Sequence, residues 1–487
     1  MYQRFIPPFR VILVFVLLAC TASYSQSPFA DDHVPDEIIV KFKTETPEEV
    51  KGQIIELHNC FVADICEDAD LDLLKIPESE IPESMIDLFS NHEEVEYAEL
   101  NYYFRQFLVP NDKLYPYQWN FYNDMNGGIN IEAAWDIQTG DPNVIIAVID
   151  SGVAYEDYDI YLQAPDLAET HFVPGYDFVN NDSHPNDDNG HGTHVTGVIA
   201  QSTNNGIGCA GIAFNCSIMP VKVMDSTGSG TTFDITNGIY FAVANGAKVF
   251  NMSLGTTSNS RTMRDAIAYT YSLGVIIVCA AGNDYQNGNP PSYPAAYDDY
   301  VIAVGATRFD QSRAYYSNTG SYLTISAPGG DTRVDQNGDG WPDGILQQTF
   351  DDDPDDFGYY FAEGTSSATP HVSGAAALLI SNGITDPNMI LEALEQTAKD
   401  LGTPGWDTQY GWGLLDIEAA LKYFQISVVI TGDINGDSIV DFDDIALLAG
   451  QWQNIAVTPL AADINGDHIV NFTDFALLAQ NWRNPPP

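Results

Sequence analysis

The sequence predicts an α/β protein whose main domain is a doubly wound parallel sheet. Apolar runs suited to buried strands alternate with segments suited to helices, which is the order of repeated strand–helix–strand units. Four strands are predicted, at residues 144–149, 248–253, 274–280 and 300–304. With 487 residues the chain is too long for one typical core. We therefore also expect a small α+β unit before the sheet domain and a small α-helical unit with paired loops after it.

Three motifs place an acid, a base and a nucleophile at the ends of predicted elements. Asp150 directly follows the first predicted strand, His191 lies between two glycines, and Ser366 precedes a predicted helix at 368–380. A serine hydroxyl is a weak nucleophile, so an imidazole must take its proton and a carboxylate must orient that imidazole. The carboxyl end of a parallel strand is also where open sheets place their sites. The motifs predict a serine peptidase with Asp150, His191 and Ser366 as catalytic residues.

Asn283 is a fourth candidate, because it comes soon after the third predicted strand. Its carboxamide can donate a hydrogen bond to the oxygen that becomes negative in the tetrahedral intermediate. These motifs and the chain order Asp, His, Ser make residues 111–424 resemble the subtilisin-like serine proteases. The resemblance implies a subtilisin-like fold and hydrolysis of peptide bonds within proteins.

The resemblance also implies where a substrate binds. Residues 251–255 and 228–230 are similar to the two strand edges between which these proteases hold an extended peptide, so broad cleavage is expected. Ser292 corresponds to the floor of the pocket for the residue before the scissile bond, which predicts a preference for apolar or aromatic residues. The alternative for residues 253–255 is a strand end without substrate contact. The substrate-binding candidates are Gly228, Ser229, Gly230, Ser253, Leu254, Gly255 and Ser292.

Residues 34–107 show the pattern strand, helix, strand, strand, helix, strand. This α+β unit resembles the inhibitor propeptides of subtilisin-like proteases, which assist folding, occupy the cleft and are then cut away. The resemblance implies a zymogen that releases this segment between about residues 104 and 114. A permanent accessory domain is the alternative, because the segment carries no motif of its own.

Residues 1–25 predict export. Two arginines, Arg4 and Arg10, precede an apolar core at 11–19, which is too short to span a bilayer and is typical of a secretory signal. The residues that end at Cys20 also resemble a bacterial lipoprotein signal, so a lipid anchor at the cell envelope competes with free secretion. No later segment predicts a transmembrane helix. The expected location is extracellular.

The chain is strongly acidic, with a formal net charge of −50 from 68 acidic and 18 basic residues. Nucleic acid is not an expected partner, because phosphate binding needs clustered Lys and Arg. The expected partners are protein or peptide substrates, and a monomer is expected. Cys209 and Cys216 either pair after export or remain buried thiols, whereas Cys279 is expected to pack inertly in a strand.

The clearest internal repeat begins at Asp433 and again at Asp463. Each copy has oxygen-bearing side chains, and a backbone carbonyl at position 7, where a twelve-residue calcium loop needs them. Aspartate at position 12 and one helix per loop make residues 431–483 resemble a type I dockerin module, which implies a cohesin-like partner. Phe442 and Phe472 depart from the small hydroxyl residues of cellulosome dockerins, so a calcium-braced tail without a partner is the alternative. The candidate ligands are Asp433, Asn435, Asp437, Ile439, Asp441, Asp444, Asp463, Asn465, Asp467, Ile469, Asn471 and Asp474.

Three further calcium sites are expected within the protease region. One acidic loop has the ligand spacing of a calcium loop, but Leu346 at its twelfth position excludes a complete one, and an unliganded turn is the alternative. A second loop resembles the calcium loop of thermitase-like proteases, and a third pair of residues corresponds to the family's tighter site. The candidate ligands are, in this order, Asp335, Asn337, Asp339 and Asp343; Asp177, Asp182 and Asn186; and Asp166 and Asn205. Calcium is thus the expected cofactor, with a structural role only.

Two other functions compete with this interpretation. Sedolisin-type peptidases share the serine motif but use a glutamate base, and His191 in its glycine-rich setting disfavours them. A binding protein with an inactive protease fold is the alternative from another class. The complete set of triad residues disfavours it.

Overall fold

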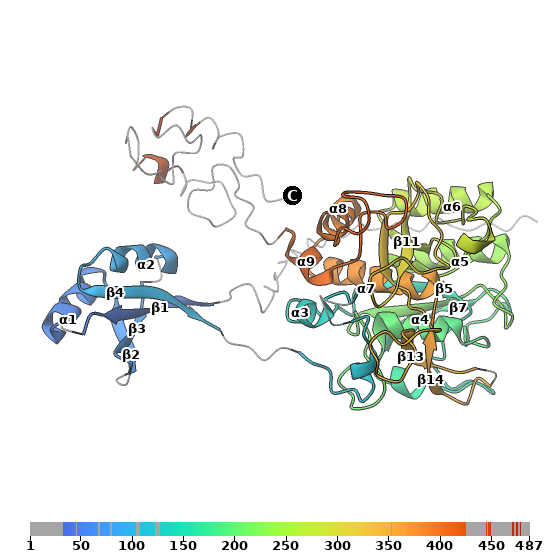
Figure 1. The fold of residues 1–487 in the computed structure, drawn as a ribbon, viewed down its shortest axis with the longest axis horizontal. Helices are drawn as coiled ribbons and strands as arrows, with labels where there is room; N and C mark the ends of the chain where they lie inside the picture. The colour runs from blue at the N-terminus through green and yellow to red at the C-terminus, as the bar shows by residue number, and fades with distance from the viewer. Residues whose placement is uncertain are drawn as a thin grey trace, which may run out of the picture. The chain divides into compact units, whose positions relative to one another are not determined.

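The computed structural model describes residues 33–424, apart from 45, 67–68, 78–79, 104–107, 122–126 and 352. Beyond residue 424 it describes 445, 447–449, 470, 471, 474, 475 and 478. The chain divides into two compact units, residues 1–106 and residues 107–487 (Figure 1).

The first unit contains a four-stranded antiparallel sheet and two helices. Its elements are, in chain order, β1 (His33–Phe42), α1 (Glu48–Leu57), β2 (Phe61–Cys66), β3 (Leu71–Lys75), α2 (Pro82–Ser90) and β4 (Val95–Tyr102). The strands are ordered β2-β3-β1-β4. Alternate residues of β1, namely Ile38, Val40 and Phe42, share one buried core with Met85 and Phe89 of α2. The predicted order of strands and helices is confirmed.

The second unit contains an eight-stranded sheet. Its strands are β5 (Ile145–Asp150), β6 (His171–Phe172), β7 (Tyr176–Asp177), β8 (Ser217–Lys222), β9 (Val249–Met252), β10 (Ile276–Ala280), β11 (Ile302–Thr307) and β12 (Ile325–Pro328). They are ordered β12-β11-β10-β9-β5-β8-β6, β7 also pairs with β8, and all these pairings are parallel. The strand order reverses at β5, which lies between β8 and β9. The carboxyl end of β5 is therefore the switch point at which open sheets bind ligands.

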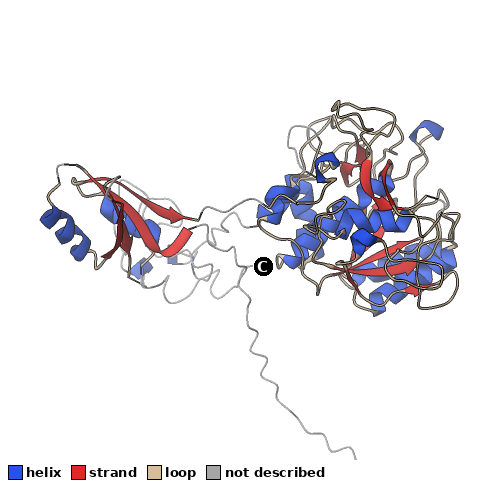
Figure 2. Cartoon of the chain, turned by 90° about the horizontal axis from the view of Figure 1, so that it is seen from below, coloured by secondary structure: helices blue, strands red, loops and turns tan. Residues whose placement is uncertain are grey.

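Helices cover both faces of this sheet, as predicted for a doubly wound fold (Figure 2). On one face lie α3 (Ile131–Trp135), α4 (His191–Ala200), α7 (Thr365–Ser381), α8 (Pro387–Thr397) and α9 (Ile417–Lys422); on the other lie α5 (Thr232–Ala244) and α6 (Arg261–Ser272). Along β5, Ile146 and Val148 enter the first core, whereas Ala147 and Ile149 enter the second. Burial on both faces explains why this strand is a continuous apolar run.

The structure contains strands that were not predicted, and one helix begins earlier than predicted. Strands β8 and β12 were not predicted, because Pro220 and Pro328 within them are typical of strand ends and edges. Helix α7 begins at Thr365, earlier than predicted, so Ser366 lies in its first turn. Threonine and serine are weak helix formers, and Pro370 lies inside the helix, so the sequence alone does not favour this early start. A hairpin of β13 (Ile345–Thr349) and β14 (Gly358–Ala362) leads into α7.

Candidate active site

Asp150 is the last residue of β5 and is fully buried at the switch point of the sheet. Its Oδ1 accepts hydrogen bonds from the backbone N–H of Ser151 at 2.8 Å and from Nδ1 of His191 at 2.7 Å. The second of these bonds requires a proton on Nδ1 of the imidazole. In this tautomer of the neutral ring, Nε2 carries no proton and can accept one. A general base needs this tautomer.

His191 is the first residue of α4, after Gly190 in a left-handed conformation with φ 90°. Its side chain is 34% exposed, so the imidazole faces the cleft while Asp150 lies beneath it. Burial alone would lower the pKa of His191, but the charge of Asp150, the hydrogen bond between them and the charge of Asp187 raise it above its ordinary value. The protonated imidazole of His191 is therefore stabilised.

Asp187 holds the loop in front of His191, and sequence reasoning missed it. Its buried carboxylate accepts bonds from the hydroxyls of Ser151 and Thr193, at 2.8 and 2.7 Å. It also accepts the backbone N–H groups of residues 189, 190 and 193. This carboxylate thus joins the residue after Asp150 to the start of α4. An aspartate four residues before His191 in the sequence was the available signal.

Ser366 lies in the first turn of α7, and α4 and α7 pack side by side (Figure 1). A Cβ atom at Gly364 would come within 2.9 Å of Ser366 Oγ and 3.4 Å of Asn283 Nδ2, so the serine hydroxyl and this amide both border the same glycine. The backbone carbonyl of Ser366 accepts a bond of 2.8 Å from the hydroxyl of Ser253. Pro370, four residues later, has no N–H with which to satisfy that carbonyl.

Asn283 is held by its carbonyl oxygen. Oδ1 accepts both the backbone N–H and the hydroxyl of Thr365, each at 2.9 Å. These two donors fix which end of the amide is the oxygen, and they leave Nδ2 as the donor on the Ser366 side. Thr365 is thus a positioning residue that sequence reasoning missed.

A cleft of about 900 Å³ passes over these residues. His191, Asn283 and Ser366 line it, together with all seven predicted substrate-binding residues, 228–230, 253–255 and 292. A smaller pocket of about 280 Å³ continues on the far side of His191 and Ser366, between the start of α4 and the β13–β14 hairpin. The structure thus brings together residues from six separate stretches of the chain. An extended peptide that crosses the site has room on both sides of Ser366.

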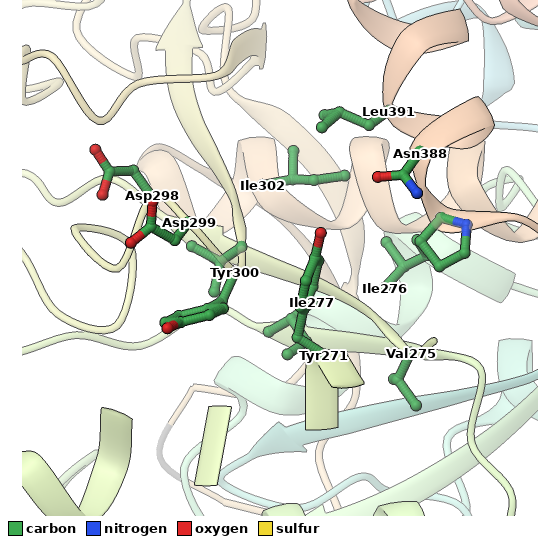
Figure 3. A pocket seen from close by; sticks show the side chains of 12 residues that line it. Tyr271, Val275, Ile276, Ile277, Asp298, Asp299, Tyr300, Ile302, Asn388 and Leu391 are labelled. Carbon is green, nitrogen blue, oxygen red and sulfur yellow. The ribbon is translucent and has the colours of Figure 1, made fainter. Parts of the chain in front are cut away.

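A pocket away from this cleft is shown in Figure 3. It has a volume of about 60 Å³ and lies at the amino ends of β10 and β11, bordered by α8. Tyr271, Ile276 and Tyr300 are among its lining side chains. The lining contains no pair of nucleophile and base, so the chemistry belongs to the cleft at the opposite ends of the strands.

Asp166 and Asn205 lie together, as predicted, with Nδ2 of Asn205 2.8 Å from Oδ1 of Asp166. Burial raises the pKa of Asp166 to about 6. Asp112, which sequence reasoning missed, is also buried, and it accepts the backbone N–H of Asn204 at 2.8 Å. Burial raises its pKa too. Two buried carboxylates thus lie within one loop cluster, and calcium prefers such oxygen ligands. The amide of Asn205 directs its Nδ2 at Asp166, and its Oδ1 accepts the backbone N–H of Ile207 at 2.9 Å.

The loop with Asp177, Asp182 and Asn186 has one buried side-chain oxygen without a hydrogen-bond partner. Asp177 accepts the backbone N–H groups of residues 179 and 180, and Asp182 accepts that of His184. Oδ1 of Asn186 is buried without a hydrogen-bond partner. Over the described ranges, no three His, Cys, Asp or Glu side chains gather closely enough to form a metal site alone. Calcium at these loops would therefore need amide and carbonyl oxygens as well.

Most predicted ligands of the C-terminal repeat, Asp433 to Asp444 and Asp463 to Ile469, lie outside the described residues, as does Cys20. Of the other two, Asp474 is buried, and its Oδ2 accepts the backbone N–H of Asn471 at 2.8 Å. Cys209 and Cys216 are buried free thiols, so the disulfide alternative is wrong for this structure. Cys279 is fully buried in β10, and burial raises its pKa, which keeps the thiol protonated and inert. None of the helices in the described part of the chain is long and apolar enough to cross a membrane.

Comparisons with known proteins agree with this geometry. The sequence model of the subtilase family matches residues 141–413, that of the fervidolysin N-terminal prodomain matches 21–101, and that of the dockerin type I domain matches 431–481. The thermophilic serine proteinase of Bacillus sp. (strain AK1) is 37% identical over 386 residues, which cover 78% of this chain and 86% of that protein. Thermitase from Thermoactinomyces vulgaris is 38% identical over 317 residues, 65% of this chain and 100% of that protein.

A solved structure of a protease from Pseudoalteromonas arctica has a TM-score of 0.56 and 32% sequence identity, and it covers 65% of this chain and 99% of its own. The match to the subtilase family sets aside the sedolisin alternative. The residues before the catalytic domain match a prodomain, so the accessory-domain alternative is also disfavoured. The chain belongs to the subtilase family of serine proteases, with a prodomain before its catalytic domain and a type I dockerin domain after it.

Proposed function

We propose that the chain is a secreted endopeptidase in which Ser366 is the nucleophile, His191 the general base and Asp150 the residue that orients the base. The single observation that carries this proposal is the 2.7 Å bond between Asp150 Oδ1 and His191 Nδ1 at the edge of the cleft that Ser366 lines. His191 takes the hydroxyl proton as Ser366 Oγ attacks the scissile carbonyl. It then gives that proton to the leaving amine, which departs as the acyl-enzyme forms.

Asn283 is the proposed donor to the tetrahedral intermediate. Its Nδ2 faces the Ser366 side because Thr365 holds its Oδ1. The oxygen of the attacked carbonyl becomes negative in the transition state, and a fixed donor at that point stabilises it without reorganisation. Water repeats the attack on the acyl-enzyme with His191 again as base, which releases the second product.

We propose that substrates bind as an extended strand between residues 228–230 and 253–255, which line the two sides of the cleft. Main-chain pairing gives little side-chain selectivity, so many proteins are substrates. Selectivity then rests on the pocket before the scissile bond, where Ser292 is 6% exposed and Gly255 would clash with the Ser292 hydroxyl if it carried a Cβ. A preference for apolar or aromatic residues follows from this proposal.

The prodomain and the export signal belong to the same proposal. The enzyme is made as a zymogen, and Ser366 cuts the chain between about residues 104 and 114. The match to a prodomain supports this, as does the α+β unit of residues 33–102. We propose free secretion, because the comparisons add no support for a lipid anchor at Cys20.

Calcium has a structural role in this proposal. Asp166, Asn205 and Asp112 would hold one ion, the loop of Asp177, Asp182 and Asn186 a second, and the repeat within residues 431–483 two more. Such ions neutralise buried carboxylates and fix loops, and the catalytic residues act without them. The dockerin domain is proposed to bind a cohesin-like protein, which would place the protease on a partner.

The test is expression of residues 27–487 with calcium, as wild type and as Ser366→Ala, followed by intact mass and casein hydrolysis. We expect only the wild type to lose about 80 to 90 N-terminal residues and to cut casein. A fluorophosphonate probe should label the wild type and leave Ser366→Ala unlabelled. If both chains fold, stay at full length and resist the probe, the endopeptidase proposal is wrong and the binding-protein alternative gains support.

A further inference from the structure

Lys222 is a lysine in the interior of the second unit, where its side chain is only 1% exposed. It is the last residue of β8 and pairs with Asp150, the last residue of β5, in the parallel sheet. Along β8, Ile218 enters the first core, whereas Met219 and Val221 enter the second. Because side chains alternate along a strand, Lys222 points to the face of the sheet that carries α4. A buried ammonium therefore lies beside the end of β5.

The ammonium of Lys222 has an acceptor for each of its three protons. Nζ donates to the backbone carbonyls of Ser151 and Met224, at 2.5 and 3.0 Å. The third acceptor is Oδ1 of Asp188, at 2.5 Å. A lysine ammonium has three donors and no acceptor, so these contacts satisfy it completely. The bonded ammonium has no lone pair with which to take a proton, so Lys222 is not a general base in this arrangement.

The three acceptors belong to three separate parts of the catalytic cleft. Ser151 directly follows Asp150 at the carboxyl end of β5. Asp188 lies three residues before His191, in the loop that leads into α4. Met224 lines the cleft. One buried ammonium thus joins the end of the strand that carries the acid, the loop before the base and the wall of the cleft.

The contact with Ser151 bears most directly on Asp150. The backbone N–H of Ser151 donates to Oδ1 of Asp150, and the same oxygen accepts the bond from Nδ1 of His191. The backbone carbonyl of Asp150 accepts the N–H groups of residues 223 and 224, at 2.8 and 3.2 Å. The backbone at Asp150 and Ser151 is therefore held by the chain after β8 and by the ammonium of Lys222. A shift of Ser151 would change the direction in which Asp150 holds the imidazole.

We propose that Lys222 is a positioning residue for Asp150, which it holds through the backbone carbonyl of Ser151. The role rests on the proposed catalytic function of Asp150, and Lys222 itself contacts no reacting atom. Without the ammonium, three acceptors lose their donor, and the loop of Asp188 is no longer tied to the end of β5. Small displacements of catalytic groups lower the rate of the chemical step, so the loss should appear in kcat.

The test compares Lys222→Met with the wild type, both as full chains with calcium. Methionine is unbranched and flexible, so it fills much of the space of the lysine without a charge or a hydrogen-bond donor. Kinetics on a small ester substrate report on the chemical step, and complete labelling with a fluorophosphonate probe counts the active sites. We expect kcat per labelled site to fall about tenfold. A merely structural role would lower the number of labelled sites or the midpoint of thermal unfolding, and would leave kcat per labelled site unchanged.

Lys248→Met is the matched control. It removes an exposed lysine next to the amino end of β9, at the opposite end of the same parallel sheet, and it should keep the wild-type kcat. If Lys222→Met gives no labelled sites, Lys222→Arg decides the question. A planar guanidinium keeps the charge but cannot donate in the three directions of an ammonium, so a kcat per labelled site below that of the wild type is expected.

A wild-type kcat per labelled site in Lys222→Met, or in Lys222→Arg where that variant decides, would overturn the proposal. The wild type, measured in the same experiment, separates this failure from that of the proposed function. A wild type that neither takes the probe nor cleaves the ester would show that the proposed function is wrong, and the role of Lys222 would fall with it. An active wild type beside an equally active Lys222→Met would remove the role of Lys222 alone.

Discussion

The hydroxyl of Ser253 donates a 2.8 Å hydrogen bond to the backbone carbonyl of Ser366. Pro370 leaves that carbonyl without the N–H that an uninterrupted helix would supply. Ser253 is itself held, because it accepts a bond of 3.0 Å from Nδ2 of Asn251, whose Oδ1 accepts the hydroxyl of Ser373. The end of β9 therefore fixes the backbone at the nucleophile through a side chain.

Ser253→Ala should remove the hydrogen bond that connects the backbone of Ser366 to the end of β9. We expect a loss of about 1–2 kcal/mol in the free energy of unfolding, since a buried carbonyl loses its donor, and about a tenfold lower kcat. Urea unfolding and steady-state kinetics on a peptide substrate measure the two effects. Ser373→Ala is the control, because it removes a neighbouring hydroxyl but keeps the bond to Ser366; a wild-type kcat in Ser253→Ala would contradict this role.

Asp150→Asn should lower kcat by about 10⁴, the magnitude typical of this substitution in serine protease triads, with little change in KM. The amide can donate to Nδ1, which then leaves the proton on Nε2 and removes the base. Kinetics on a peptide substrate measure the loss, and the calorimetric midpoint verifies that the variant folds. Asp298→Asn, in the pocket of Figure 3, removes the same charge away from the cleft and should keep full activity. A loss of less than tenfold in Asp150→Asn would show that another group orients His191.

The acid limb of kcat/KM should have a midpoint above the ordinary histidine pKa of about 6.5, because Asp150 and Asp187 raise the pKa of His191. The base is active only when neutral, so a raised pKa moves the rise in activity to higher pH. Asp187→Asn should shift this midpoint to lower pH, since one of the two negative charges is removed. A pH profile of both enzymes with one small ester substrate measures the shift. An unchanged or higher midpoint in Asp187→Asn would contradict the electrostatic role of this carboxylate.

Stability without calcium should decrease as pH rises from about 4 to about 6. Burial raises the pKa of Asp166 to about 6 from its ordinary value of 3.8, so the folded state binds this proton more tightly than the unfolded state. The protonated carboxyl of Asp166 therefore adds about 3 kcal/mol to the free energy of unfolding. This stabilisation is fully present below the pKa of the unfolded state and is lost as pH rises through the pKa of the folded state. Unfolding midpoints between pH 3.5 and 7 with a chelator measure it, and the difference between wild type and Asp166→Asn isolates this group.

Calcium should reverse that trend, because the ion binds the ionised carboxylate and only the folded state offers the site. At pH 7 we expect millimolar calcium to raise the midpoint of the wild type more than that of Asp166→Asn. If calcium raises the unfolding midpoint of the wild type and of Asp166→Asn by the same amount, there is no cation site at Asp166.

The sequence by itself determined the fold class, the order of elements in the first unit and the residues that meet in the cleft. The catalytic candidates could be predicted because each follows a strand or opens a helix, and parallel strands carry such residues to the same edge of the sheet. The assignment as a serine protease also rested on local motifs, and the match to the subtilase family confirmed this assignment. Strands β8 and β12 could not be predicted, since a proline in a buried strand has the local signature of a loop.

Only the tertiary structure decided which groups support the catalytic residues. Asp187, Thr365 and Ser253 act through hydrogen bonds between elements that are distant in the sequence or that meet only after the sheet forms. Likewise, the free state of Cys209 and Cys216 and the unpartnered oxygen of Asp343 depend on packing. Sequence motifs and hydrophobic periodicity reflect local geometry. Burial and hydrogen-bond satisfaction are properties of the assembled core, so no local sequence pattern encodes them.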